Sequence, residues 1–79
     1  MNTHIHQVEV VVHVDEALSD EQRAALVGHL QEHDGVEHAG FTAGRDHLMV
    51  IEYDSNKLHT GDVLSYVKQE HVNAELIGV

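Results

Sequence analysis

The sequence predicts a single α+β domain, in which a four-stranded antiparallel sheet carries two helices on one face. Residues 1–79 allow one domain and no more. Alternating apolar positions predict strands, and two stretches with helical apolar spacing lie between them. The chain has no cysteine. A second subunit, a bound ion or good packing must therefore supply the stability that small domains often take from disulfides.

The first strand and first helix are predicted by clear periodicities. Residues 6–14 alternate in hydrophobicity, as in a strand with one better-buried face. The inward side of this strand holds Val8, Val10, Val12 and Val14. A helix over 19–33 begins at Ser19, which can cap it, and ends before Gly35, which is free to adopt left-handed backbone.

The rest of the chain predicts a hairpin, a helix and a last strand. Strands over 36–42 and 47–53 are joined by a turn at 43–46. A helix over 60–70 and a strand over 73–79 follow. The order β-α-β-β-α-β is the split β-α-β, or ferredoxin-like, arrangement, which leaves the second sheet face to solvent or to a partner.

Four short stretches match a family pattern that extends over residues 8–79 without a gap. They are Asp34-Gly35-Val36, Ile51-Glu52-Tyr53-Asp54, Lys57-Leu58 and Val72-Asn73-Ala74-Glu75-Leu76. In these stretches the chain resembles the heavy-metal-associated (HMA-like) domains, small ferredoxin-like domains found as copper chaperones and at the N-termini of metal-transporting ATPases. The resemblance implies the same fold, with glycine preferred where this chain has His71.

The metal-binding motif of that family is missing. Its Met-x-Cys-x-x-Cys positions fall on Ala17, Ser19 and Gln22. A hydroxyl and an amide at a helix start are better explained as capping groups than as ligands. The resemblance therefore implies no cuprous-copper site here.

Composition favours a different class of ion. Nine histidines and fourteen acids, without cysteine, suit a divalent transition metal such as Zn, Ni, Co or Cu(II). The net charge of -10 argues against binding to nucleic acid or to an anionic membrane surface. No apolar run approaches the roughly 20 residues of a membrane span. The first residues lack a secretion pattern, so a cytoplasmic location is expected.

Two histidine pairs have spacing that predicts a shared ion. His29 and His33 are four residues apart on the predicted helix and can project from one face. Alternatively, they are half-buried at the helix C-terminal end, where a positive histidine favours the dipole. His4 and His6 leave an extended segment on the same side, and the alternative is a frayed polar terminus.

A third candidate crosses the predicted hairpin. If Phe41 pairs with Met49, His38 faces Glu52 on the open side of the sheet. This imidazole and carboxylate are either metal ligands or a plain cross-strand ion pair.

A fourth group lies beside the loop where the related domains hold their metal. His13 with Asp15 or Glu16, and Asp20, would make an oxygen-rich site. The alternative is a solvated acidic turn.

The outward side of the sheet is more apolar than a solvated face requires. Its predicted apolar residues are Val11, Leu48, Val50, Ile77 and Val79. Such a patch predicts a homodimer or higher homo-oligomer through that face. The alternative is that Glu9 and Glu52 keep this face exposed to solvent.

Catalysis is not predicted, because no serine has a nucleophile-elbow context and no glycine-rich phosphate loop is present. Two functions remain. One is a protein that senses, buffers or transfers a divalent ion with histidine and carboxylate ligands. The other is a thiol-free, self-associating interaction or regulatory module without metal.

Overall fold

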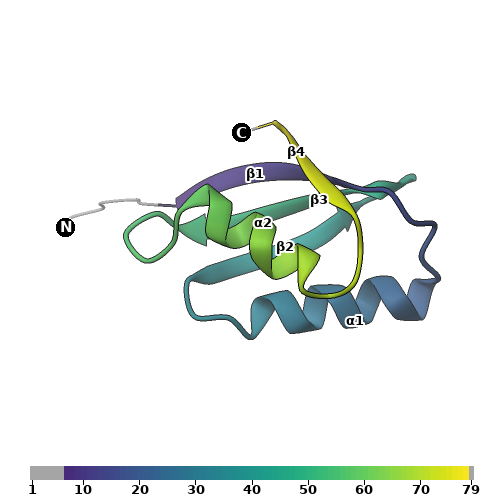
Figure 1. The fold of residues 1–79 in the computed structure, drawn as a ribbon, viewed down its shortest axis with the longest axis horizontal. Coiled ribbons are helices and arrows are strands. Elements are labelled where there is room, and N and C mark those ends of the chain that lie inside the picture. Colours follow the sequence, from purple (N-terminus) through teal and green to yellow (C-terminus); the bar gives the residue numbers. More distant parts are fainter. Residues whose placement is uncertain (1–6, 79) are drawn as a thin grey trace.

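The computed structural model describes residues 7–78 and confirms the predicted fold class (Figure 1). In chain order the elements are β1 (Gln7–Val14), α1 (Asp20–Gln31), β2 (Val36–Thr42), β3 (Arg45–Asp54), α2 (Thr60–Lys68) and β4 (Ala74–Gly78). The strands form one antiparallel sheet in the order β2-β3-β1-β4.

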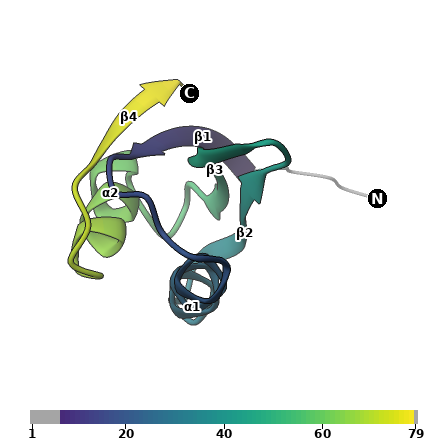
Figure 2. The same ribbon diagram turned by 90° about the vertical axis from the view of Figure 1, so that its right-hand side faces the viewer.

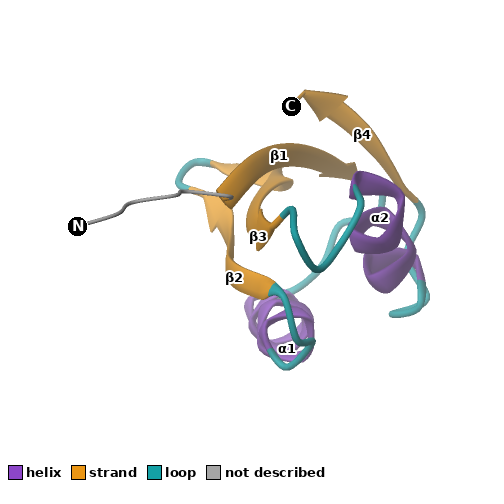
Figure 3. Cartoon of the chain, turned by 90° about the vertical axis from the view of Figure 1, so that its left-hand side faces the viewer, coloured by secondary structure: helices purple, strands orange, loops and turns teal. Residues whose placement is uncertain are grey.

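Both helices lie on the same side of the sheet, and no helix covers the other face (Figures 2 and 3). The core fills the space between the two layers, and its fully buried side chains alternate along β1 and β3 as predicted. The largest of them are Leu30, Met49, Ile51, Val10, Val12, Val14, Val63 and Val67. No helix among the described residues is long and apolar enough to cross a membrane.

Helix α1 begins as predicted and ends two residues earlier. Ser19 is its N-cap residue and Gln31 its last residue. After Gln31, the amides of Glu32 and His33 donate to carbonyls only three residues back, which tightens the chain out of the α-helix. Gly35, with φ of 99°, then turns the chain into β2. His33 therefore lies outside α1, although the sequence predicted that His29 and His33 share one helix.

The β2–β3 hairpin is tighter than predicted. Thr42 pairs with Arg45, so the connection is two residues long rather than the predicted four at 43–46. Gly44 makes this possible, because its φ of 77° is a conformation that glycine adopts without strain. Strand β3 consequently starts two residues earlier than predicted.

A β-bulge sets the register between β4 and β1. Val11 pairs with Gly78, but Val12 pairs with Leu76, so the register between β1 and β4 shifts by one residue. Such a bulge adds one residue to one strand. Beyond it, His13 lies directly opposite Glu75.

Candidate metal centre

The positions where the resemblance to heavy-metal-associated domains places the metal motif form a helix cap in this chain. The Gln22 amide N–H donates to Ser19 Oγ at 3.1 Å, and the Ser19 amide N–H donates to Gln22 Oε1 at 2.8 Å. This is a reciprocal capping box, which satisfies two otherwise unpaired backbone donors. The predicted capping role of both residues is confirmed.

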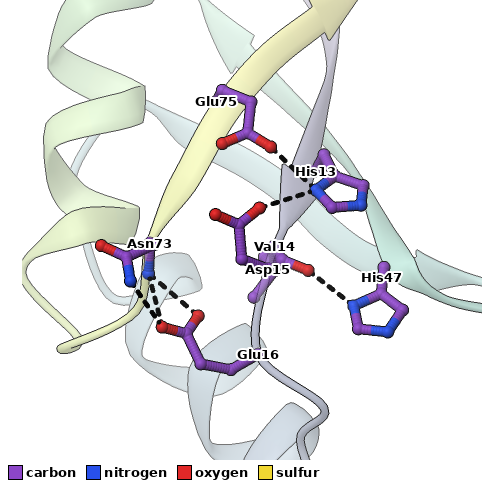
Figure 4. Close-up of polar contacts among 7 residues, drawn as sticks. All are labelled: His13, Val14, Asp15, Glu16, His47, Asn73 and Glu75. Carbon is purple, nitrogen blue, oxygen red and sulfur yellow. Dashed lines mark hydrogen bonds and ion pairs between the residues drawn. The ribbon is translucent and has the colours of Figure 1, made fainter.

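The group of three potential ligands with the shortest distances between its atoms lies at the end of β1, just before α1. His13 Nδ1 lies 3.0 Å from Asp15 Oδ1 and 2.8 Å from Glu75 Oε2 (Figure 4). Within residues 7–78 this is the one group of three histidine or acidic side chains whose ligand atoms all lie within 4.8 Å of one another. The side chains are 38%, 49% and 53% exposed, so an ion can reach them from solvent.

The chemistry of this arrangement allows a shared proton or a shared metal ion. His13 Nδ1 carries at most one proton, and both carboxylates can only accept hydrogen bonds. When Nδ1 is deprotonated, three lone-pair donors converge on one point, and a proton or a metal ion is what such a set binds. Ligand atoms about 2.1 Å from a tetrahedral zinc ion are about 3.4 Å apart. The distances of 3.0 and 2.8 Å from His13 Nδ1 to the two carboxylate oxygens would therefore have to open by about 0.4 and 0.6 Å.

Neighbouring contacts hold this group in place. His47 Nδ1 donates to the Val14 carbonyl at 2.7 Å, and its ring stacks on His13 with centroids 5.6 Å apart (Figure 4). Glu16 accepts from both the backbone and the side-chain amide of Asn73. Asn73 in turn accepts from the Asp15 amide through its carbonyl, at 2.8 Å. These bonds fix the start of β4 against the end of β1.

The structure brings only part of the predicted His13 group together. Asp15 belongs to it, whereas Glu16 is engaged with Asn73, and Asp20 forms an ion pair with Arg23. The third member of the group is a residue from β4.

His29 and His33 make separate contacts instead of a chelating pair. His29 Nδ1 lies 2.6 Å from Glu70 Oε1, and this hydrogen bond, with the charge of Glu70, raises the pKa of His29. The His33 ring stacks on Tyr66, with centroids 3.7 Å apart. Since His33 follows the end of α1, the predicted spacing on one helix face does not hold.

The predicted pairing across the hairpin is confirmed in register. Phe41 lies opposite Met49, and His38 lies opposite Glu52. Glu52, however, accepts a hydrogen bond of 2.7 Å from the Gln7 side chain. Neither His38 nor Glu52 belongs to a group of three ligands in the described part of the chain.

Two predictions fall on residues that the structure does not describe. His4 and His6 lie before residue 7, and Val79 lies after residue 78. The other four predicted interface residues are on the sheet: Val11, Leu48 and Val50 are half-buried, and Ile77 is 54% exposed.

Sequence reasoning missed Glu75 as a member of this group. The alternation of β4 marks it as outward, because Ala74 is buried and Leu76 partly buried. The alternation shows on which side of the sheet Glu75 lies. It does not show which residue of β1 lies opposite Glu75, because this depends on the β1–β4 register.

No protein-family model matches the sequence, and no curated protein matches it significantly. Solved structures do match. A copper-binding domain from HMA7, a P-type ATPase, has a TM-score of 0.78 at 16% identity, over 89% of this chain and 93% of that one. A putative copper-ion-binding protein from Bacillus anthracis str. Ames has a TM-score of 0.75 at 13% identity, over 87% and 96%. The CopZ metallochaperone has a TM-score of 0.71 at 14% identity, over 89% and 100%.

The similarity to these structures covers 87–89% of this chain, while the sequence identity is only 13–16%. It shows that this chain has the ferredoxin-like fold of the heavy-metal-associated domains, in a sequence without the two cysteines of their motif.

Proposed function

We propose that this chain is a metal-binding domain that holds a divalent transition ion with His13, Asp15 and Glu75. The observation that supports the proposal is the convergence of one imidazole nitrogen and two carboxylate oxygens within 4.8 Å. The fold supports it further, because the solved structures that share it include copper-binding domains and metallochaperones.

The donor set selects the class of ion. One nitrogen and two oxygens, without sulfur, suit Zn, Co, Ni or Cu(II) and are poor ligands for cuprous copper. The net charge of -10 favours cations near the surface in general. Since the imidazole must be deprotonated to bind, affinity is expected to fall as the pH is lowered.

The exposure of the three side chains suits an exchangeable ion. A structural zinc site has four protein ligands, whereas this group supplies three and leaves coordination positions open. This favours sensing, buffering or transfer of an ion over a structural role. A cytoplasmic location remains a prediction for cell fractionation.

Native mass spectrometry after titration with each of the four ions tests the proposal. The wild-type chain is expected to retain one ion per copy, and His13→Ala and Glu75→Gln are expected to lose it. His29→Ala is the matched control, because His29 is an exposed histidine engaged with a carboxylate outside the group. The proposal is wrong if the wild-type chain retains no ion at micromolar concentration, or if His29→Ala and His13→Ala lose it equally.

A further inference from the structure

The face of the sheet that the helices leave uncovered, the open face, has three zones along its strands. At one end Glu9 lies opposite Glu52, and in the middle Val11 lies opposite Val50. At the other end His13 lies opposite Glu75. Side chains directly opposite one another in antiparallel strands share a face. The open face is therefore acidic at one end and apolar in the centre, and it carries the candidate metal ligands at the other end.

This layout complements itself under a two-fold rotation. Glu9 and His13 are each two residues from Val11, about 7 Å along the strand on either side of it. A two-fold axis between the two sheets, parallel to them, at right angles to the strands and level with the Val11–Val50 pair, reverses the strands of a second copy. Glu9 of the second copy then lies over His13 of the first, and the apolar centres meet.

We propose that the open face binds a second copy of this chain when metal is present. This second proposal depends on the metal site proposed above. Each of two equivalent ions is held by His13, Asp15 and Glu75 of one copy and by Glu9 of the other. The dimer is isologous, so both ends of the interface form the same contact. Sheets packed face to face are about 10 Å apart, a gap that an imidazole and a glutamate can bridge through one ion.

Buried area alone does not hold such a dimer together. Seven paired positions of β1 and β3 in a four-stranded sheet correspond to a flat area of about 450 Å² per copy, or about 900 Å² in total. Stable interfaces bury about 1,200–2,000 Å². The two bridging ions must supply the remaining stability.

Charge also makes the association depend on metal. Each copy carries a net charge of -10, and close contact adds Asp15 and Glu75 of one copy to Glu9 of the other. Like charges at an interface oppose association. A divalent ion among these carboxylates turns that repulsion into attraction.

Native mass spectrometry with sedimentation velocity tests the inference, using the wild-type chain with and without zinc. The expected result is a monomer without zinc and a dimer holding two ions with zinc. A monomer that retains one ion overturns the dimer and leaves the metal site standing. A chain that retains no ion overturns both proposals, and a dimer that forms equally without zinc overturns the bridging role of the ion.

Three variants separate the zones. Val50→Lys is expected to remain a monomer that still retains one zinc ion, and Ile77→Lys, at a 54% exposed position, serves if Val50→Lys does not fold. Glu9→Gln weakens a direct ligand and is expected to weaken the zinc-loaded dimer by at least roughly 10-fold, because loss of a group that only supports a ligand already costs about that much. Glu21→Gln, an exposed acid on α1, is the control that keeps the dimer. Equal dimerisation of Glu9→Gln and Glu21→Gln would contradict the bridge.

Discussion

Replacing Gly35 by alanine is expected to destabilise the fold more than the same replacement at Gly44 or Gly28. The backbone φ at Gly35 is 99°, and an added Cβ would lie 2.8 Å from Leu58 Cγ and 3.2 Å from Lys57 Cβ. Leu58 is only 8% exposed, and the Gly35 carbonyl accepts a hydrogen bond of 2.8 Å from the Asp54 amide. Neither the side chain nor the backbone is free to move away.

Two costs add at this position. A residue with a Cβ in left-handed backbone costs about 1–2 kcal/mol, and overpacking costs about 1–3 kcal/mol, so the loss is about 2–5 kcal/mol. A chain of 79 residues has a free energy of unfolding of about 4–12 kcal/mol in all. Gly35→Ala therefore removes a large share of it.

Urea denaturation followed by circular dichroism measures this loss against two controls. Gly44→Ala has φ of 77° but no atom within 4 Å of the added Cβ, so it carries only the backbone cost of about 1–2 kcal/mol. Gly28→Ala, exposed within α1, is expected to stabilise by about 0.5–1 kcal/mol. If Gly35→Ala loses no more than Gly44→Ala, the close approach to Leu58 is not what requires glycine at this turn.

Three further predictions concern the ends of the helices. His71 has φ of 67° without being glycine, so His71→Gly is expected to raise the free energy of unfolding by about 1 kcal/mol, and a loss in urea denaturation would contradict this. Ser19→Ala removes the cap of α1 and is expected to cost about 1 kcal/mol in the same assay, whereas no change would show that the capping box adds nothing. The hydrogen bond and charge of Glu70 raise the pKa of His29. The stabilisation from this pair is therefore fully present below the usual histidine pKa of about 6.5 and is lost as the pH rises through the raised value. In NMR titrations Glu70→Gln should lower the pKa of His29, and an unchanged pKa would refute this cause.

The fold was predictable because each element has a local cause. The valines of β1 alternate, Ser19 and Gln22 cap α1, and Gly35 ends the turn after it. The errors lie at boundaries, where the choice is between nearly equal hydrogen-bonding patterns. The amide of His33, for example, donates three residues back rather than four, which no side chain in the sequence specifies.

The candidate site was less predictable, because its members are brought together by sheet register. Local spacing pointed to His29 with His33, which the fold engages elsewhere. His13 and Glu75, by contrast, are 62 residues apart in sequence. No local pattern connects positions at that separation.

The bulge between β1 and β4 is the feature that makes the site. Without the shift after Val11, the pairing that starts with Gly78 would continue to place His13 opposite Leu76. An apolar side chain would then replace a carboxylate beside the imidazole. Because a one-residue shift changes which side chain faces the partner strand, the extra residue, Ile77, determines both the ligand set and the exposed apolar group next to it. The candidate metal site and the apolar surface of the open face thus have one structural origin, and this favours their acting together.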